Sequence, residues 1–83
     1  MSNNTTLYVW IEHYKPKEGE PKYERWLEVE RSKKSLAVEA AVRAACGKVY
    51  ELRDRQVPFV RVFISKEWRE PKAKADKEAF TYR

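Results

Sequence analysis

Two side chains of this 83-residue chain are of types used in nucleophilic catalysis, but each stands alone. His13 is the single histidine and Cys46 the single cysteine. A catalytic nucleophile needs a base oriented beside it, and a zinc site needs several cysteine or histidine ligands at close spacing. The two glycines, Gly19 and Gly47, do not form a phosphate-binding loop. The sequence therefore predicts no catalytic residue, no metal site and no cofactor.

Both residues have structural interpretations. We expect His13 at the rim of a strand, on its core side, and Cys46 as a small buried thiol near the end of a helix, where the helix dipole opposes a thiolate. A chain this short has a thin core, which disfavours an enclosed pocket of ~300 Å³ or more. A small nuclease that uses Arg, Lys, Glu and Tyr without histidine is the enzymatic alternative. We favour a protein that binds without catalysing a reaction.

Basic residues give the clearest local signal for a binding partner. The segment Arg31–Ser35 contains three cations and two hydroxyls at the expected start of a helix. Helix N-termini carry free N–H groups and a partial positive charge, so they attract anions. Three further arginines follow the predicted helix. The predicted polyanion-binding residues are Arg31, Lys33, Lys34, Arg53, Arg55 and Arg61.

The net charge of +5 is unevenly distributed along the chain. Residues 1–41 hold seven basic and seven acidic side chains, whereas residues 42–83 hold eleven basic and six acidic ones. The excess of five therefore lies in the second half. Such a bias raises the affinity for polyanions, which predicts nucleic acid or a nucleoprotein complex as the partner.

Three segments read as strands and one as a helix. Residues 5–14, 23–31 and 57–64 are rich in β-branched and aromatic residues, which favour strands. Residues 15–22 contain two prolines and a glycine and read as a loop. The alanine-rich stretch 36–46 reads as a helix. These elements predict an α+β domain with one helix on an antiparallel sheet of three or four strands, in the order β-β-α-β-β or β-β-α-β.

The residue pattern leaves alternatives at both ends of the helix. Ser32 or Ser35 is expected to cap its N-terminus. We favour a helix that ends at Gly47, in the left-handed conformation common at helix ends, followed by a short strand at Lys48–Arg53. A continuous helix to about Arg53 is the alternative, because Val49 and Leu52 keep the apolar spacing.

Strict alternation gives the predicted sheet two apolar faces. The helix would cover the aliphatic one, formed by Leu7, Val9, Ile11, Leu27, Val29, Val60, Val62 and Ile64. An exposed aromatic patch of the size expected on the other face usually marks an interaction site. It is a predicted partner or dimer interface, and its residues are Tyr8, Trp10, Tyr14, Trp26, Phe59 and Phe63.

Four arrangements compete for this aromatic face. The C-terminal segment can fold back so that Phe80 and Tyr82 cover it. A homodimer can bury it, or another protein can bind it, since aromatic residues are favoured in interface cores. A base-stacking platform for single strands is the fourth, which Glu12 and the glutamates of residues 24–30 disfavour because carboxylates repel phosphates.

These observations predict one domain over residues 1–83, with a disordered N-terminus at 1–5 and a charged C-terminal segment at 66–83. A lone cysteine, no apolar run of about 20 residues and no signal-peptide pattern favour the cytoplasm and no membrane partner. The predicted function is non-enzymatic binding of a polyanion through basic residues. The alternative is a protein-interaction module, an inhibitor or adaptor of a larger assembly of the kind that phages also encode, acting through the aromatic face.

Overall fold

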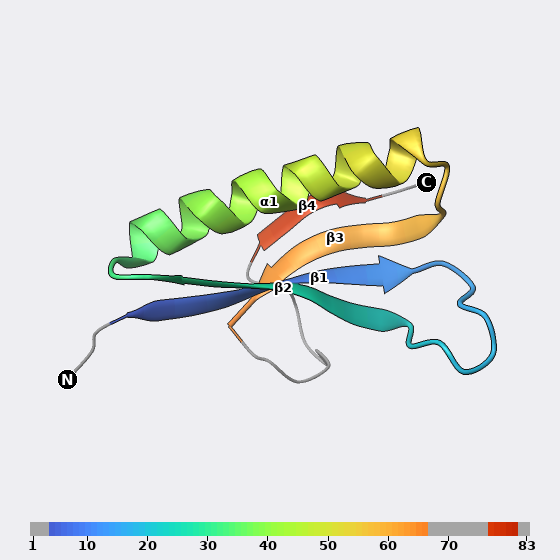
Figure 1. Ribbon diagram of the computed structural model, residues 1–83, viewed down its shortest axis with the longest axis horizontal. Coiled ribbons are helices and arrows are strands. Elements are labelled where there is room, and N and C mark those ends of the chain that lie inside the picture. The colour runs from blue at the N-terminus through green and yellow to red at the C-terminus, as the bar shows by residue number, and fades with distance from the viewer. Residues whose placement is uncertain (1–3, 67–76, 82–83) are drawn as a thin grey trace.

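The computed structural model describes residues 4–66 and 77–81. The order of its elements confirms the predicted α+β fold with one helix packed on an antiparallel sheet (Figure 1). The predicted N-terminal disorder is wrong at residues 4–5, because Thr5 begins a strand and the Asn4 side chain donates a hydrogen bond to Glu30. The elements are β1 (Thr5–His13), β2 (Tyr23–Arg31), α1 (Lys34–Asp54), β3 (Phe59–Ser65) and β4 (Lys77–Thr81).

The strands form one antiparallel sheet in the order β2-β1-β3-β4. Helix α1 lies across one face of this sheet, which we call the helix face (Figure 1). The other side of the sheet is called the opposite face. On the helix face the strands contribute to the core the buried side chains Leu7, Val9, Ile11, Val29, Phe59, Val62 and Ile64.

A stripe of alanines fixes how closely the helix approaches the sheet. Ala37, Ala41 and Ala45 recur every four residues, so they share one side of α1, and none has exposed surface. Val49 and Leu52 continue the same buried stripe to the end of the helix. Small side chains let the helix backbone approach the sheet while the larger valine, isoleucine and phenylalanine side chains of the strands fill the interface.

The helix does not end at Gly47, so the favoured prediction of a break and a short strand at Lys48–Arg53 is wrong. Gly47 has helical neighbours on both sides, and α1 runs on to Asp54 as the alternative predicted. An interior glycine costs roughly 1 kcal/mol relative to alanine. Burial of Val49 and Leu52 beyond it offsets that cost, since each fully buried side chain of this size contributes about 1.5–3 kcal/mol.

The start of the helix also differs from the prediction. Lys33 occupies the N-cap position with φ −128° and ψ 145°, and no side chain caps the helix. Neither Ser32 nor Ser35 therefore has the capping role that the sequence suggested.

Two register irregularities change which side chains share a face. Trp10 pairs with Arg25 while Val9 pairs with Leu27, so Trp26 is an extra residue on β2. Such a β-bulge places two successive side chains on the same side of the strand. Trp26 and Leu27 consequently both pack against the core on the helix face.

The second irregularity lies between β1 and β3. Glu12 pairs with Arg61 and His13 pairs with Phe59, which leaves Val60 as the extra residue. Phe59 is therefore fully buried in the core beneath the helix, and Val60 lies outside that core cluster. The predicted aromatic assignment of Trp26 and Phe59 is wrong because strict alternation fails at both bulges.

The C-terminal prediction is tested only in part. Of the predicted charged segment, Lys66 and strand β4 are described, and the rest of 66–83 lies outside the described residues. The backbone of β4 pairs with β3 and extends the sheet at its edge, so this stretch does not lie flat on a sheet face. Tyr82 lies outside the described residues. Among those that are described, no helix combines the length and apolar character needed to cross a membrane.

A substitution at Gly47 distinguishes a helix interior from a helix end. A Cβ atom at Gly47 meets no heavy atom within 4 Å. We expect Gly47→Ala to raise the free energy of unfolding by about 0.5–1 kcal/mol, because alanine is the better helix former. Urea unfolding followed by circular dichroism measures the change.

The matched control is Gly19→Ala in the β1–β2 loop, where φ is +88° and alanine is strained. That variant should be destabilised. Destabilisation by Gly47→Ala as well would contradict a continuous α1.

Candidate functional site

The first turn of α1 is a place where an anion can approach the backbone N–H groups of the helix. Arg31, Lys33 and Lys34 are exposed there, and the first turn holds no acidic residue. Because no side chain caps the helix, its first N–H groups are left to solvent or a ligand. Neither Lys33 nor Lys34 forms an ion pair with any residue that the structure describes. Cations and free N–H groups therefore coincide at this end of the helix.

A shallow open hollow of about 720 Å³ begins at this turn and follows the flank of α1. Lys34 and Arg43 contribute cations to its lining, and Val38 and Val42 lie between them at the apolar flank. The guanidinium of Arg43 forms an ion pair with Glu39 at 3.0 Å. The hollow can accept an extended ligand with a negatively charged group at the helix start.

The second predicted basic set lies at the far end of the helix. Arg53 and Arg55 follow Lys34 by about 20 residues, which corresponds to roughly 30 Å along a helix. Glu51 shares this end: it accepts a hydrogen bond from Lys48 at 2.9 Å and one from Arg55 at 3.5 Å. The Lys48 ammonium lowers the pKa of Glu51 below its ordinary value, and Arg55 adds to the effect. One copy of the chain therefore does not bring the two basic sets together.

Arg61 lies apart from both sets, on the opposite face of the sheet. Its Nε donates a hydrogen bond to Glu12 at 2.9 Å, and its guanidinium stacks over the Phe63 ring at 4.3 Å. Lys22 approaches the same carboxylate at 4.0 Å. This ion pair is mostly buried, so Arg61 neutralises a carboxylate within the fold and is a poor candidate for binding a ligand.

The aromatic residues of the opposite face pack on one another. Trp10 and Phe63 stack with their ring centroids 6.4 Å apart, and the edge of Tyr23 meets Phe63 at 6.2 Å. Trp10 is 4% exposed and Phe63 is 0% exposed. The Nε1–H of Trp10 is buried and has no hydrogen-bond partner among the described residues. The centre of the predicted aromatic interface is therefore not an exposed surface.

The remaining members of the predicted interface are dispersed. Tyr8 is half-buried on the opposite face, where the Arg25 guanidinium lies 5.8 Å from its ring centroid. Tyr14 is exposed in the loop after β1. Trp26 and Phe59 belong to the helix face. The six residues thus occupy both faces and a loop, and they do not form one surface.

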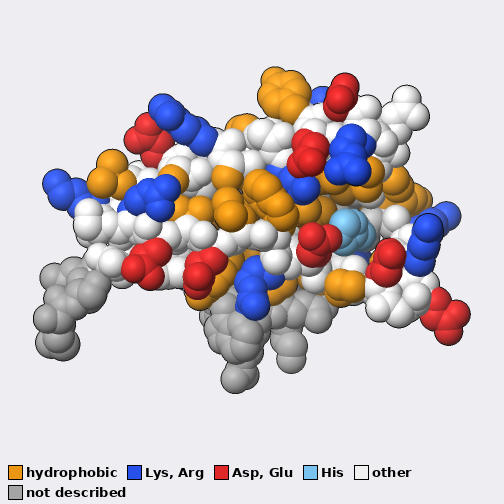
Figure 2. All heavy atoms as spheres, in the orientation of Figure 1, with side chains coloured by type: hydrophobic (Ala, Val, Ile, Leu, Met, Phe, Trp, Pro, Cys, Tyr) orange, Lys and Arg blue, Asp and Glu red, His pale blue; other side chains and the backbone are white. Residues whose placement is uncertain are grey.

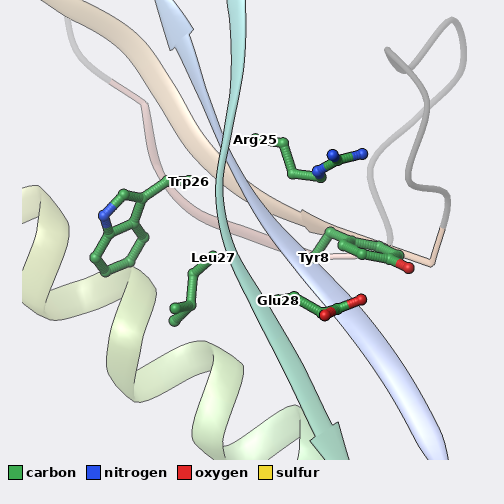
Figure 3. A pocket seen from close by; sticks show the side chains of 5 residues that line it. All are labelled: Tyr8, Arg25, Trp26, Leu27 and Glu28. Carbon is green, nitrogen blue, oxygen red and sulfur yellow. The ribbon is translucent and has the colours of Figure 1, made fainter.

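The outer edge of β2 carries a surface that sequence reasoning missed. A hollow of about 510 Å³ is lined by residues of this strand together with Tyr8 (Figure 3). Trp26 and Leu27 point toward α1, while Arg25 and Glu28 point away from it (Figure 3). The Lys48 ammonium lies 4.9 Å from the Trp26 ring centroid. The sequence held one signal for this contact. The apolar spacing from Val38 to Leu52 places Lys48 within the helix.

The groups first considered for catalysis have other environments. The Nε2 of His13 lies 2.9 Å from the Glu24 carboxylate at the rim of the helix face. Cys46 is exposed on α1, well before the helix ends, so its predicted burial is wrong. Within residues 4–66 and 77–81, no group of three or more Cys, His, Asp or Glu side chains is arranged to hold a metal ion.

The chain matches no protein-family model, no curated protein and no solved structure. The assignment of a function consequently rests on the geometry described above.

Removing the charge at two of the predicted polyanion-binding arginines should have different effects on stability. We expect Arg61→Met to lower the free energy of unfolding by about 1–3 kcal/mol, because it leaves the Glu12 carboxylate mostly buried with a weakened set of partners. Chemical denaturation in urea measures this loss.

Arg55→Met is the matched control, since Arg55 forms an exposed pair with Glu51 at 3.5 Å. We expect this variant to change stability by at most about 0.5 kcal/mol. Equal effects of the two substitutions would show that the Arg61–Glu12 pair does not stabilise the fold.

Proposed function

We propose that this protein is a non-enzymatic binding module that engages nucleic acid through the basic start of α1, formed by Arg31, Lys33 and Lys34. The observation that carries the proposal is the first turn of the helix, which has exposed cations, no acidic residue and no side-chain cap. Free N–H groups and the helix dipole attract phosphate, and lysine and arginine side chains add contacts to phosphate oxygens.

An extended polyanion fits this surface better than a small anion. Basic residues stand at both ends of α1, about 30 Å apart, close to the length of one turn of B-form duplex. The net charge of +5 favours such a partner by raising the rate of encounter and the non-specific affinity. Successive phosphates of one strand can contact the helix start and its flank.

Three acidic residues of the strands face away from this approach, whereas Glu39 lines the flank of α1 and is paired with Arg43. Glu12, Glu28 and Glu30 share the opposite face, as their register with Arg61, Tyr8 and Thr6 requires. Figure 2 views the molecule with α1 uppermost and shows acidic side chains (red) both along its lower part and on the side of α1. Nucleic acid bound at the helix start would lie on the other side of the sheet from these carboxylates.

We also propose that the protein does not catalyse a reaction. Among the described residues, the His13 imidazole is engaged by Glu24, and the exposed Cys46 is on the helix, away from that pair in the sequence. A nucleophile activated by a neighbouring base requires the two groups within hydrogen-bond reach. We therefore expect the protein to bind without cleaving or modifying its partner.

Salt dependence tests the proposal directly. We expect the affinity for a short duplex or single-stranded oligonucleotide to fall as salt rises, with a linear relation between the logarithms of the binding constant and the salt concentration. The double substitution Lys33→Gln and Lys34→Gln should reduce the magnitude of that slope by about two. Fluorescence anisotropy of a labelled oligonucleotide measures both quantities.

The control is Lys15→Gln with Lys17→Gln, which removes two positive charges from the exposed β1–β2 loop. It should retain most of the affinity and the slope. No binding at low salt and micromolar protein would refute the proposed function, and equal losses in the two variants would refute the proposed site.

A further inference from the structure

Strand β2 lies at the edge of the sheet with its outer side unpaired. It is nine residues long, and its paired neighbour is β1 on the inner side. No described strand hydrogen-bonds to its outer edge. An edge of this length presents a row of backbone donors and acceptors that can pair with another strand.

Two of the usual protections against such pairing, proline and lysine, are missing from β2, whereas two others, charged side chains and a bulge, are present. Proline and lysine commonly block edge strands, and neither occurs between Tyr23 and Arg31. The bulge at Trp26 is the one irregularity in its pairing with β1. The strand is therefore suited to accept a partner strand that accommodates the bulge.

An apolar strip runs beside this edge on the helix side. Trp26 and Leu27 of β2 and Val38 and Val42 of α1 are half-buried and pack against the core. Figure 2 shows hydrophobic side chains (orange) gathered in a band across the middle of the molecule, below α1. A strand added to β2 would extend the sheet under this strip and bury it further. Pairing at this edge thus gains apolar burial in addition to backbone hydrogen bonds.

The charged side chains of β2 are exposed, and two of them also contact β1: Glu24 lies 2.9 Å from His13, and the Arg25 guanidinium lies 5.8 Å from the Tyr8 ring centroid. Five of its nine residues are charged, and the β1 residue opposite each one is uncharged. The cross-strand pairs are Glu24 with Ile11, Arg25 with Trp10, Glu28 with Tyr8, Glu30 with Thr6 and Arg31 with Thr5. Opposite charges placed across a new strand pair would stabilise it.

When two copies of β2 run antiparallel, acidic residues of one copy lie opposite basic residues of the other. Acidic and basic residues run Glu24, Arg25 at one end and Glu30, Arg31 at the other. We propose that β2 pairs antiparallel with β2 of a second copy of this chain about a two-fold axis. Arg25 of one copy then lies across from Glu30 of the other, and Glu24 across from Arg31.

The bulge makes this register consistent with the two faces of the sheet. Arg25 and Glu30 both lie on the opposite face, while Glu24 and Arg31 share the helix face, as their β1 partners show. Trp26 and Leu27 of one copy then oppose Val29 of the other on the helix face. Glu28 meets its own copy at the axis, and an Arg25–Glu30 pair flanks the two carboxylates on each side.

Pairing through β2 also determines where the basic residues of the two copies lie. Strand β2 and helix α1 run in opposite directions side by side (Figure 1), so the two-fold axis sets the two helices antiparallel on the same face. Lys33 and Lys34 of one copy then lie at the same end of the assembly as Arg53 and Arg55 of the other. The dimer thereby places at one end two basic sets that a single copy holds about 30 Å apart.

Sedimentation equilibrium without nucleic acid tests the dimer independently of the proposed function. We expect the native chain to dimerise with a dissociation constant in a measurable range, and Arg25→Glu to raise that constant about tenfold or more, because each dimer contains the pair twice. Adding Glu30→Arg to Arg25→Glu exchanges the two charges and should restore most of the affinity. Lys17→Glu, an equal charge reversal in the loop, should leave the constant unchanged.

A native chain that remains monomeric at several hundred micromolar overturns the proposal, as does a dimer that Arg25→Glu leaves intact. Failure of the double variant to recover affinity, while its circular dichroism and thermal unfolding match the native protein, overturns the register. Capture of an extended strand from a different protein by a monomeric chain would also contradict self-pairing. The dimer and the binding of nucleic acid are measured separately, so either can fail alone.

Discussion

Close packing of the alanine stripe of α1 on the sheet is the constraint on which the other features depend. Ala37, Ala41 and Ala45 are fully buried and hold the helix against β1 and β3. A larger side chain at any of these positions would push the helix away from the strands and overpack the core. Because one side of the helix is committed to this contact, its basic ends and the flank with Val38 and Val42 remain at the surface.

The β-bulges at Trp26 and Val60 decide which other side chains remain available for binding. They move Trp26 and Phe59 to the helix face and leave Trp10 and Phe63 stacked on the opposite face, both buried. Trp26 then forms part of the flank beside the edge of β2. The surfaces proposed for binding consequently lie along one edge of the sheet and at the helix start, and the described residues do not form the broad exposed aromatic face expected from alternation.

Much of the fold follows from local patterns in the sequence. The alternation in β1 assigns Leu7, Val9 and Ile11 to the core, and the alanine spacing identifies the buried side of the helix. The bulges do not follow, because a register between segments distant in sequence depends on backbone hydrogen bonds that no local pattern encodes. The helix end was also misjudged, since burial of Val49 and Leu52 outweighs the local preference of Gly47. The sequence showed the basic start of α1. Its distance from Arg53 follows only from the observed length of the helix.

Both proposed surfaces depend on the bulge in β2, which turns Trp26 toward the helix. Nuclear Overhauser contacts from the indole protons of Trp26 test it most directly. We expect contacts with the side-chain methylenes of Lys48, whose ammonium lies 4.9 Å from the ring centroid, and none with the Trp10 ring. Contacts from Trp26 to Trp10 or Phe63 would instead place it on the opposite face and contradict both the assigned surfaces and the proposed dimer edge.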